Sequence, residues 1–180
     1  MRDRWSNEVA RTLSPFGVYK KFPDRGYKVK ADPSKGLGEP DVEPGFPDAV
    51  FICASGGCFV ETKTGGTAFP FLNWRPNQRA WYENICAPFG IPYYLFLVMG
   101  ETITSKKYPR IALLMTAEAF LTIERENEGR KSLPYAYAAG RVDLRLQWAG
   151  NSRWLIPDGH PFAQQFLLEN KNDAAYRSVG

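Results

Sequence analysis

GFPDAVFICASGGCFVETKTG, residues 45–65, contains two apolar runs on either side of the turn-forming tetrapeptide Ala-Ser-Gly-Gly. Two such runs separated by a short glycine-containing turn are typical of a β-hairpin. Both faces of each run are apolar, which is typical of central strands that are covered on both sides. The stretch therefore predicts a buried hairpin with strands over residues 49–53 and 58–63.

Three ionisable side chains lie at the ends of this hairpin, namely Asp48, Glu61 and Lys63. With a four-residue loop over residues 54–57, Asp48 would face Lys63, and Glu61 would lie diagonally across from it. Because side chains alternate between the two faces of a strand, all three would then share one face. A three-residue loop would move Asp48 to the opposite face, so we expect the four-residue loop or a bulge with the same effect.

Two clustered carboxylates beside an ammonium group suit a hard divalent cation. Magnesium prefers oxygen ligands and is commonly held by one or two carboxylates together with water. A cation at this place would polarise a phosphoryl oxygen and activate a water molecule. The alternative is an ordinary salt bridge between Lys63 and Asp48 or Glu61, since Glu-x-Lys is a frequent pattern.

Periodicity and turn residues predict the remaining elements. We expect helices over residues 4–14, 76–88, 117–126 and 162–168, strands over 92–100, 111–116 and 141–148, and a loop-rich segment over 15–47. This order predicts an α/β fold with a central mixed sheet flanked by helices. A length of 180 residues fits one domain, 1–180.

Composition excludes several classes of protein. The three cysteines have no metal-ligand spacing, and the single histidine, His160, leaves little basis for a zinc site or a histidine-based triad. The N-terminal sequence has no apolar signal core and no segment is long enough to span a membrane, so we expect a cytoplasmic protein. The net charge of +4 and the lysine-rich segment 19–35 favour a polyanionic partner, although a solvated loop is the alternative.

The arrangement Pro47-Asp48 followed by Glu61-Thr62-Lys63 resembles the motif of the PD-(D/E)xK nuclease superfamily. The resemblance implies that Asp48, Glu61 and the backbone carbonyl of Thr62 bind Mg²⁺, with Mn²⁺ as a substitute, and that Lys63 positions the nucleophile. Asp41, in a second Pro-Asp pair, is a rival ligand. We prefer Asp48 because a strand follows it directly.

A longer block, ETKTGGTAFPFLNWRPNQ over residues 61–78, is similar to RecU-type Holliday junction resolvases of bacteria and phages. The resemblance implies a restriction-endonuclease-like core over about residues 1–125 and a nucleophile-positioning role for Gln78. It also implies that Glu8 in the first helix helps to bind metal. The alternatives are an exposed helix acid at Glu8 and an amide bonded to its own helix terminus at Gln78. Residues 127–180 have no counterpart and form an extension of unknown role.

These features predict a Mg²⁺-dependent endodeoxyribonuclease, bacterial or phage-encoded, that cleaves four-way DNA junctions as a homodimer. Its phosphate contacts are expected at Lys20, Lys21, Arg75 and Arg79. The alternatives are another PD-(D/E)xK nuclease of replication, repair or restriction type, and a DNA-binding module that has lost activity.

Overall fold

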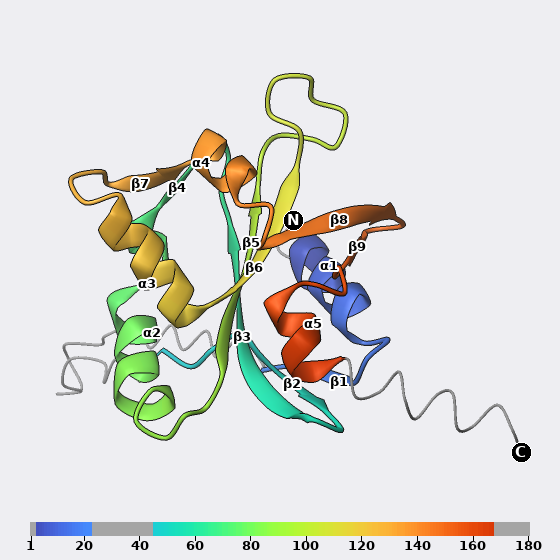
Figure 1. Cartoon of the computed structure of the whole chain (residues 1–180), viewed down its shortest axis with the longest axis vertical. Helices are drawn as coiled ribbons and strands as arrows, with labels where there is room; N and C mark the ends of the chain where they lie inside the picture. The colour runs from blue at the N-terminus through green and yellow to red at the C-terminus, as the bar shows by residue number, and fades with distance from the viewer. Residues whose placement is uncertain (1–2, 23–44, 168–180) are drawn as a thin grey trace, which may run out of the picture.

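The structure is a computed structural model that describes residues 3–22 and 45–167 (Figure 1). The helices are α1 (Asp3–Leu13), η2 (Phe71–Asn73), α2 (Pro76–Trp81), η3 (Tyr82–Cys86), α3 (Ala117–Glu126), α4 (Tyr135–Gly140) and α5 (Pro161–Phe166). The strands are β1 (Val18–Lys21), β2 (Ala49–Cys53), β3 (Gly56–Thr64), β4 (Ala68–Pro70), β5 (Tyr93–Met99), β6 (Ile111–Thr116), β7 (Ser132–Pro134), β8 (Arg145–Gly150) and β9 (Arg153–Leu155). Within the described residues, no helix has the length and apolar character needed to cross a membrane.

Seven strands form one mixed sheet in the order β1-β2-β3-β5-β6-β8-β9, and β4 pairs with β7 in a separate ribbon. The strands β3 and β5 are parallel, and the other neighbours in the large sheet are antiparallel. The chain between β3 and β5 includes α2, so this helix belongs to the crossover that a parallel pair requires. The sequence prediction of an α/β fold with a mixed sheet flanked by helices is confirmed.

The sheet separates two hydrophobic cores, as the helices on its two sides in Figure 1 show. The first core lies under α1 and α5 and includes Val9, Phe51, Val60, Phe96 and Phe162. The second core lies under α2, α3 and α4. It includes Trp74, Tyr93, Leu95, Phe120 and Tyr135. Consecutive residues of β5 alternate between the two cores, which explains why the whole strand is buried and apolar.

The hairpin turn is shorter than predicted. Ile52 pairs with Gly57 and Cys53 with Gly56, so the loop consists of Ala54 and Ser55 alone. Gly56 takes a φ of 131°, which side chains rarely allow, and a Cβ on Gly57 would lie 2.9 Å from the carbonyl oxygen of Phe51. The two glycines expected in the loop therefore belong to β3. This changes the register by two residues, and a shift of two keeps every side chain on its predicted face.

The predicted strand over residues 141–148 is wrong in its first half, because β8 begins only at Arg145. Residues 142–144 form a turn, in which Arg141 donates to both carboxylate oxygens of Asp143. The long helix predicted over 76–88 divides into α2 and the π-helical η3. The short elements β1, β4, β7, α4 and β9 were not predicted, since three to six residues carry too little periodicity.

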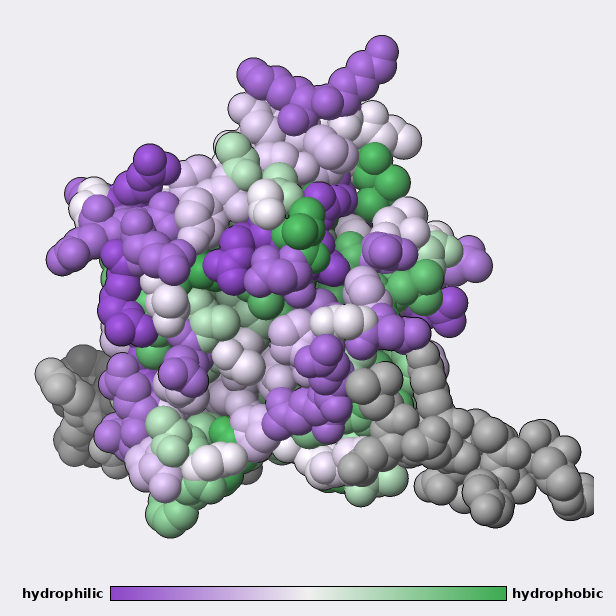
Figure 2. All heavy atoms as spheres, viewed as in Figure 1, coloured by the Kyte–Doolittle hydropathy of each residue, from purple (hydrophilic) through white to green (hydrophobic). Residues whose placement is uncertain are grey.

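The surface in Figure 2 is mostly hydrophilic, and apolar side chains gather after α2 and over the β8–β9 hairpin. Phe89, in the turn that follows η3, is 76% exposed, and Val142, before β8, is 74% exposed. The apolar residues of β6, in contrast, are buried within the sheet between β5 and β8. The strand β6 therefore offers little exposed surface for an interface with another molecule.

Candidate active site

The hairpin and α2 bring four of the predicted site residues together. Asp48 immediately precedes β2, Glu61 and Lys63 lie in β3, and Gln78 lies in the first turn of α2. Because Ala49 pairs with Val60, the register places Asp48 opposite Glu61, and the Asp48 N–H donates to Glu61 Oε2 at 3.2 Å. The sequence prediction that Asp48, Glu61 and Lys63 share one face of the sheet is confirmed.

Glu61, Lys63 and Gln78 form a closed hydrogen-bonded triangle. Lys63 Nζ and Gln78 Nε2 donate to Glu61 Oε1 at 2.6 and 2.5 Å, and Lys63 Nζ also donates to Gln78 Oε1 at 2.8 Å. The same Gln78 oxygen accepts from the Arg75 N–H at the helix N-terminus, at 3.1 Å. Gln78 thus bonds to the N-terminus of its own helix, as the alternative interpretation predicted. It also bonds to the charged pair of Glu61 and Lys63.

Burial and a second carboxylate make Glu61 an unusual acid. Its side chain has no exposed surface. Desolvation, and then the neighbouring charge of Asp48, raise the pKa of Glu61 from 4.5 to about 7, against the opposing effects of Lys63 and Tyr93. The site therefore holds a carboxyl group that gains or loses its proton near neutral pH, directly opposite Asp48.

Tyr93 is a member of the site that sequence reasoning missed. Its hydroxyl donates to Glu61 Oε2 at 3.2 Å, and burial raises the pKa of this phenol well above its usual range. The parallel register places Phe59 beside Tyr93, so the tyrosine reaches Glu61 from the next strand. The only signal in the sequence was a tyrosine inside a strand that is otherwise buried and apolar, because a buried hydroxyl needs a partner.

Thr62 and Asp48 are linked through the backbone. The Thr62 N–H donates to Asp48 Oδ2 at 2.8 Å, which fixes the orientation of this half-buried carboxylate. A ligand role for the Thr62 carbonyl stays a prediction. Asp41, the rival ligand, lies outside the described residues, and so does most of the lysine-rich segment 19–35.

The structure does not bring Glu8 to the other site residues. Its neighbour Val9 packs in the first core, on the face of the sheet opposite Glu61. Glu8 Oε2 accepts from Arg110 Nη2 at 2.5 Å and from Trp154 Nε1 at 3.2 Å. The alternative of an exposed helix acid is wrong, since Glu8 is fully buried. A buried carboxylate needs such partners to offset its lost hydration.

The four predicted phosphate contacts differ in their surroundings. Lys20 pairs with Val50 and is exposed on the face that carries Asp48, whereas Lys21 pairs with Ala49 and lies on the opposite face. Arg75 is exposed at the start of α2. Arg79, in contrast, is engaged within the protein, as the following contacts show.

Arg79 ties α2 to α3 and to the preceding loop. Its Nη1 and Nη2 donate to the two carboxylate oxygens of Glu124 at 2.7 and 3.1 Å. Its Nε donates to the Trp74 carbonyl at 3.0 Å, its Nη2 to the Phe71 carbonyl at 2.9 Å, and the guanidinium lies 5.2 Å from the Trp74 ring centroid. These bonds use the donors that a phosphate would need, so the structure favours a structural role for Arg79.

Arg79→Ala is expected to lower the free energy of unfolding by about 1–3 kcal/mol, because it removes charge-assisted hydrogen bonds and leaves Glu124 without its partner. Arg75→Ala, its exposed neighbour, is expected to change stability by less than about 0.5 kcal/mol. Urea denaturation of both variants checks this, and equal losses would contradict the structural role.

His160 does not supply a base for this site. Its Nδ1 accepts from the Phe162 N–H at 3.1 Å and caps α5, and its other ring nitrogen lies 3.3 Å from the Leu144 carbonyl. Burial lowers the pKa of His160, so the ring stays neutral. Cys53, Cys58 and Cys86 are free thiols, and Cys53 is only half-buried.

The donor set fits a hard divalent cation. Within residues 3–22 and 45–167, no group of three or more acidic, histidine or cysteine side chains is close enough to hold a metal. Two carboxylates suffice for Mg²⁺ when water completes its shell. Asp48 and Glu61 lie close enough for their charges to raise the pKa of Glu61, and a cation between them would relieve this repulsion.

The sequence matches no known protein-family model and no curated protein. The geometry of the described residues therefore carries the functional argument.

Proposed function

We propose that this protein is a Mg²⁺-dependent endodeoxyribonuclease with a restriction-endonuclease-like core. The observation that carries the proposal is the convergence of Asp48, Glu61, Lys63 and Gln78 in one network on one face of the sheet. These are the positions that the resemblance to PD-(D/E)xK nucleases selects. A single Glu-x-Lys salt bridge would require neither Gln78 nor the second carboxylate.

In this proposal Asp48, Glu61 and the Thr62 carbonyl would hold the metal ion, and a bound ion would polarise the phosphoryl oxygen and make its water more acidic. Lys63 Nζ, with a side chain only 12% exposed, orients the attacking water and offsets the negative charge that develops on the phosphate. Gln78 and Glu61 hold this ammonium group from two sides. In-line attack by water would leave a 5′-phosphate and a 3′-hydroxyl.

Within this class, the proposed substrate is a four-way DNA junction. Its support is the similarity of residues 61–78 to RecU-type resolvases. Symmetric cleavage of a junction needs two active sites that face opposed strands, so this substrate requires a two-fold homodimer.

Incubation with a synthetic four-way junction, a Y-fork and linear duplex arms, each with Mg²⁺ or EDTA, tests the proposal. We expect paired nicks at the junction with Mg²⁺ and none with EDTA. Cleavage of linear duplex as fast as the junction would instead favour a restriction-type or repair nuclease. Absence of cleavage with both Mg²⁺ and Mn²⁺, together with retained DNA binding, would favour a non-catalytic DNA-binding module.

A further inference from the structure

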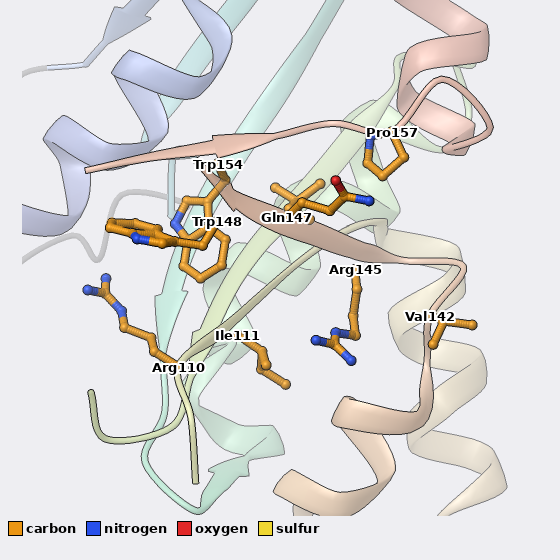
Figure 3. A pocket seen from close by; sticks show the side chains of 9 residues that line it. Arg110, Ile111, Val142, Arg145, Gln147, Trp148, Trp154 and Pro157 are labelled. Carbon is orange, nitrogen blue, oxygen red and sulfur yellow. The ribbon is translucent and has the colours of Figure 1, made fainter. Parts of the chain in front are cut away.

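A second site lies in the C-terminal extension, which the proposed active site does not use. A cavity of about 430 Å³ opens between the start of β6 and the β8–β9 hairpin. Its lining includes Arg110, Arg145, Trp148 and Trp154. In Figure 3 the two arginine side chains lie on either side of Ile111, and the two indole rings lie together on the Arg110 side.

The cavity exists because two strands separate. The β6–β8 ladder has two pairs, Ala112 with Leu146 and Leu113 with Arg145. Beyond Ala112 the strands no longer pair, and β8 continues instead in its hairpin with β9. The residues that would form the next pairs, around Ile111 and Gln147, line the cavity instead.

The charge of this region is positive. Arg110 is paired with Glu8, but no ion pair is recorded for Arg145 among the described residues. Arg145 Nη1 donates to the Ala139 carbonyl at 3.2 Å, while its Nε is buried without a hydrogen-bond partner. A buried donor of this kind is costly unless a ligand satisfies it.

A neighbouring cavity of about 420 Å³ extends the positive region. Its lining includes Arg11 and Arg153, on α1 and β9. Among the residues that the structure describes, no aspartate or glutamate lines either cavity. Arginines on three elements of the fold thus surround the β8–β9 hairpin. The Glu8 carboxylate next to the cavity is already bonded to Arg110 and to the Trp154 indole, and the remaining arginines favour a polyanionic ligand.

The indole rings indicate what kind of polyanion fits. Trp148 is half-buried, and its ring packs edge-to-face on that of Trp154, with centroids 4.9 Å apart. Aromatic side chains stack on nucleobases, but a duplex keeps its bases paired and stacked inside. A cavity with an aromatic wall can therefore accept a base only from an unpaired strand.

We propose that the cavity between β6 and β8 binds an unpaired segment of DNA. Arg145 contacts a phosphate of this segment, and an unpaired base packs against Trp148. Arg11 and Arg153 contact neighbouring phosphates. The identification of the polyanion as DNA rests on the proposed function, in which DNA is the substrate. The site itself is separate, because β8 lies three strands from β3, about 14 Å across the sheet.

The test is DNA binding by the full chain in EDTA, where no cleavage is expected. The probes are a fluorescein-labelled single-stranded oligothymidylate and a blunt duplex of equal length. Arg145→Ala is expected to weaken binding of the single strand at least about tenfold, with a smaller loss for the duplex. The slope of log affinity against log salt should fall by about 0.7, the value for one lost phosphate contact.

Arg141→Ala is the matched control, since Arg141 lies just before β8 and is paired with Asp143. It should bind both probes as the unaltered chain does. Arg145→Lys should recover part of the affinity. Such a recovery would mean that the loss in Arg145→Ala comes from the missing positive charge and not from misfolding. The single strand, but not the duplex, should quench tryptophan fluorescence, and Trp148→Phe should remove most of this signal.

Equal binding by Arg145→Ala and Arg141→Ala would overturn the proposal. So would binding of thymidine monophosphate as tight as that of the oligonucleotide, because the cavity would then serve a free nucleotide. A failure of the nuclease proposal alone would give a different experimental result. A chain that binds single strands through Arg145 and cleaves nothing would retain this site without the proposed activity.

Discussion

Asp48→Asn is expected to lower cleavage of a four-way junction by at least about a hundredfold, since even the loss of a group that only supports a metal ligand typically costs about 10- to 100-fold. The asparagine oxygen can still accept the Thr62 N–H, so the local fold should persist. What the substitution removes is one negative charge beside Glu61. DNA binding in EDTA should stay the same, which separates cleavage from recognition.

Rates under single-turnover conditions with Mg²⁺ measure this effect. Asp143→Asn is the control, because Asp143 is an exposed carboxylate that is paired with Arg141 outside the site. It should cleave like the unaltered chain. Lys63→Ala should be as inactive as Asp48→Asn, and full activity in Lys63→Ala would refute the proposed role of the ammonium group.

Glu61→Gln is expected to gain stability relative to the unaltered chain as pH rises. At pH 4 the Glu61 carboxyl is mostly protonated in both the folded and the unfolded chain. Between pH 4.5 and about 7 the unfolded chain releases this proton and the folded chain retains it, so the free energy of unfolding falls through that window. Above it the folded chain carries the full cost of a buried carboxylate. Glutamine has no such cost, so the difference in unfolding free energy should shift by roughly 3 kcal/mol in favour of the variant between pH 4 and pH 8.

Urea denaturation in EDTA at the two pH values measures this shift. Glu118→Gln, which alters an exposed carboxyl in the first turn of α3, should show no comparable change. Addition of Mg²⁺ at pH 8 should stabilise the unaltered chain and not Glu61→Gln, because a ligand stabilises only the state that binds it. A difference independent of pH would contradict a raised Glu61 pKa.

The sequence predicted the centre of the site well because local rules govern it. Alternation along two strands placed Asp48, Glu61 and Lys63 on one face, and the resemblance over residues 61–78 pointed to Gln78, which contacts Glu61 and Lys63. The prediction assigned Gly56 and Gly57 to the loop because glycine is frequent in turns, although both belong to β3. Because of this error, the predicted partner of Asp48 across the hairpin was Lys63 instead of Glu61. The side of the sheet on which Asp48 lies was still predicted correctly.

Long-range contacts explain why the surroundings of Arg79 and Glu8 differ from those predicted. Arg79 meets Glu124, 45 residues away, and Glu8 meets Arg110, 102 residues away. No local pattern relates such partners, because strand order and helix placement bring them together only in the folded chain. Tyr93 joined the site for the same reason, through the parallel pairing of β3 with β5.

The two-residue turn at Ala54 and Ser55 has an evolutionary consequence. Inward-facing Ala49, Phe51 and Val60 fix which side of each strand meets the core. A residue inserted at Ala54 or Ser55 lengthens the loop and leaves the pairs of β2 with β3 unchanged. Homologues should therefore tolerate turns of unequal length here and keep their carboxylates facing each other, whereas an insertion inside β2 or β3 would turn one carboxylate to the opposite face.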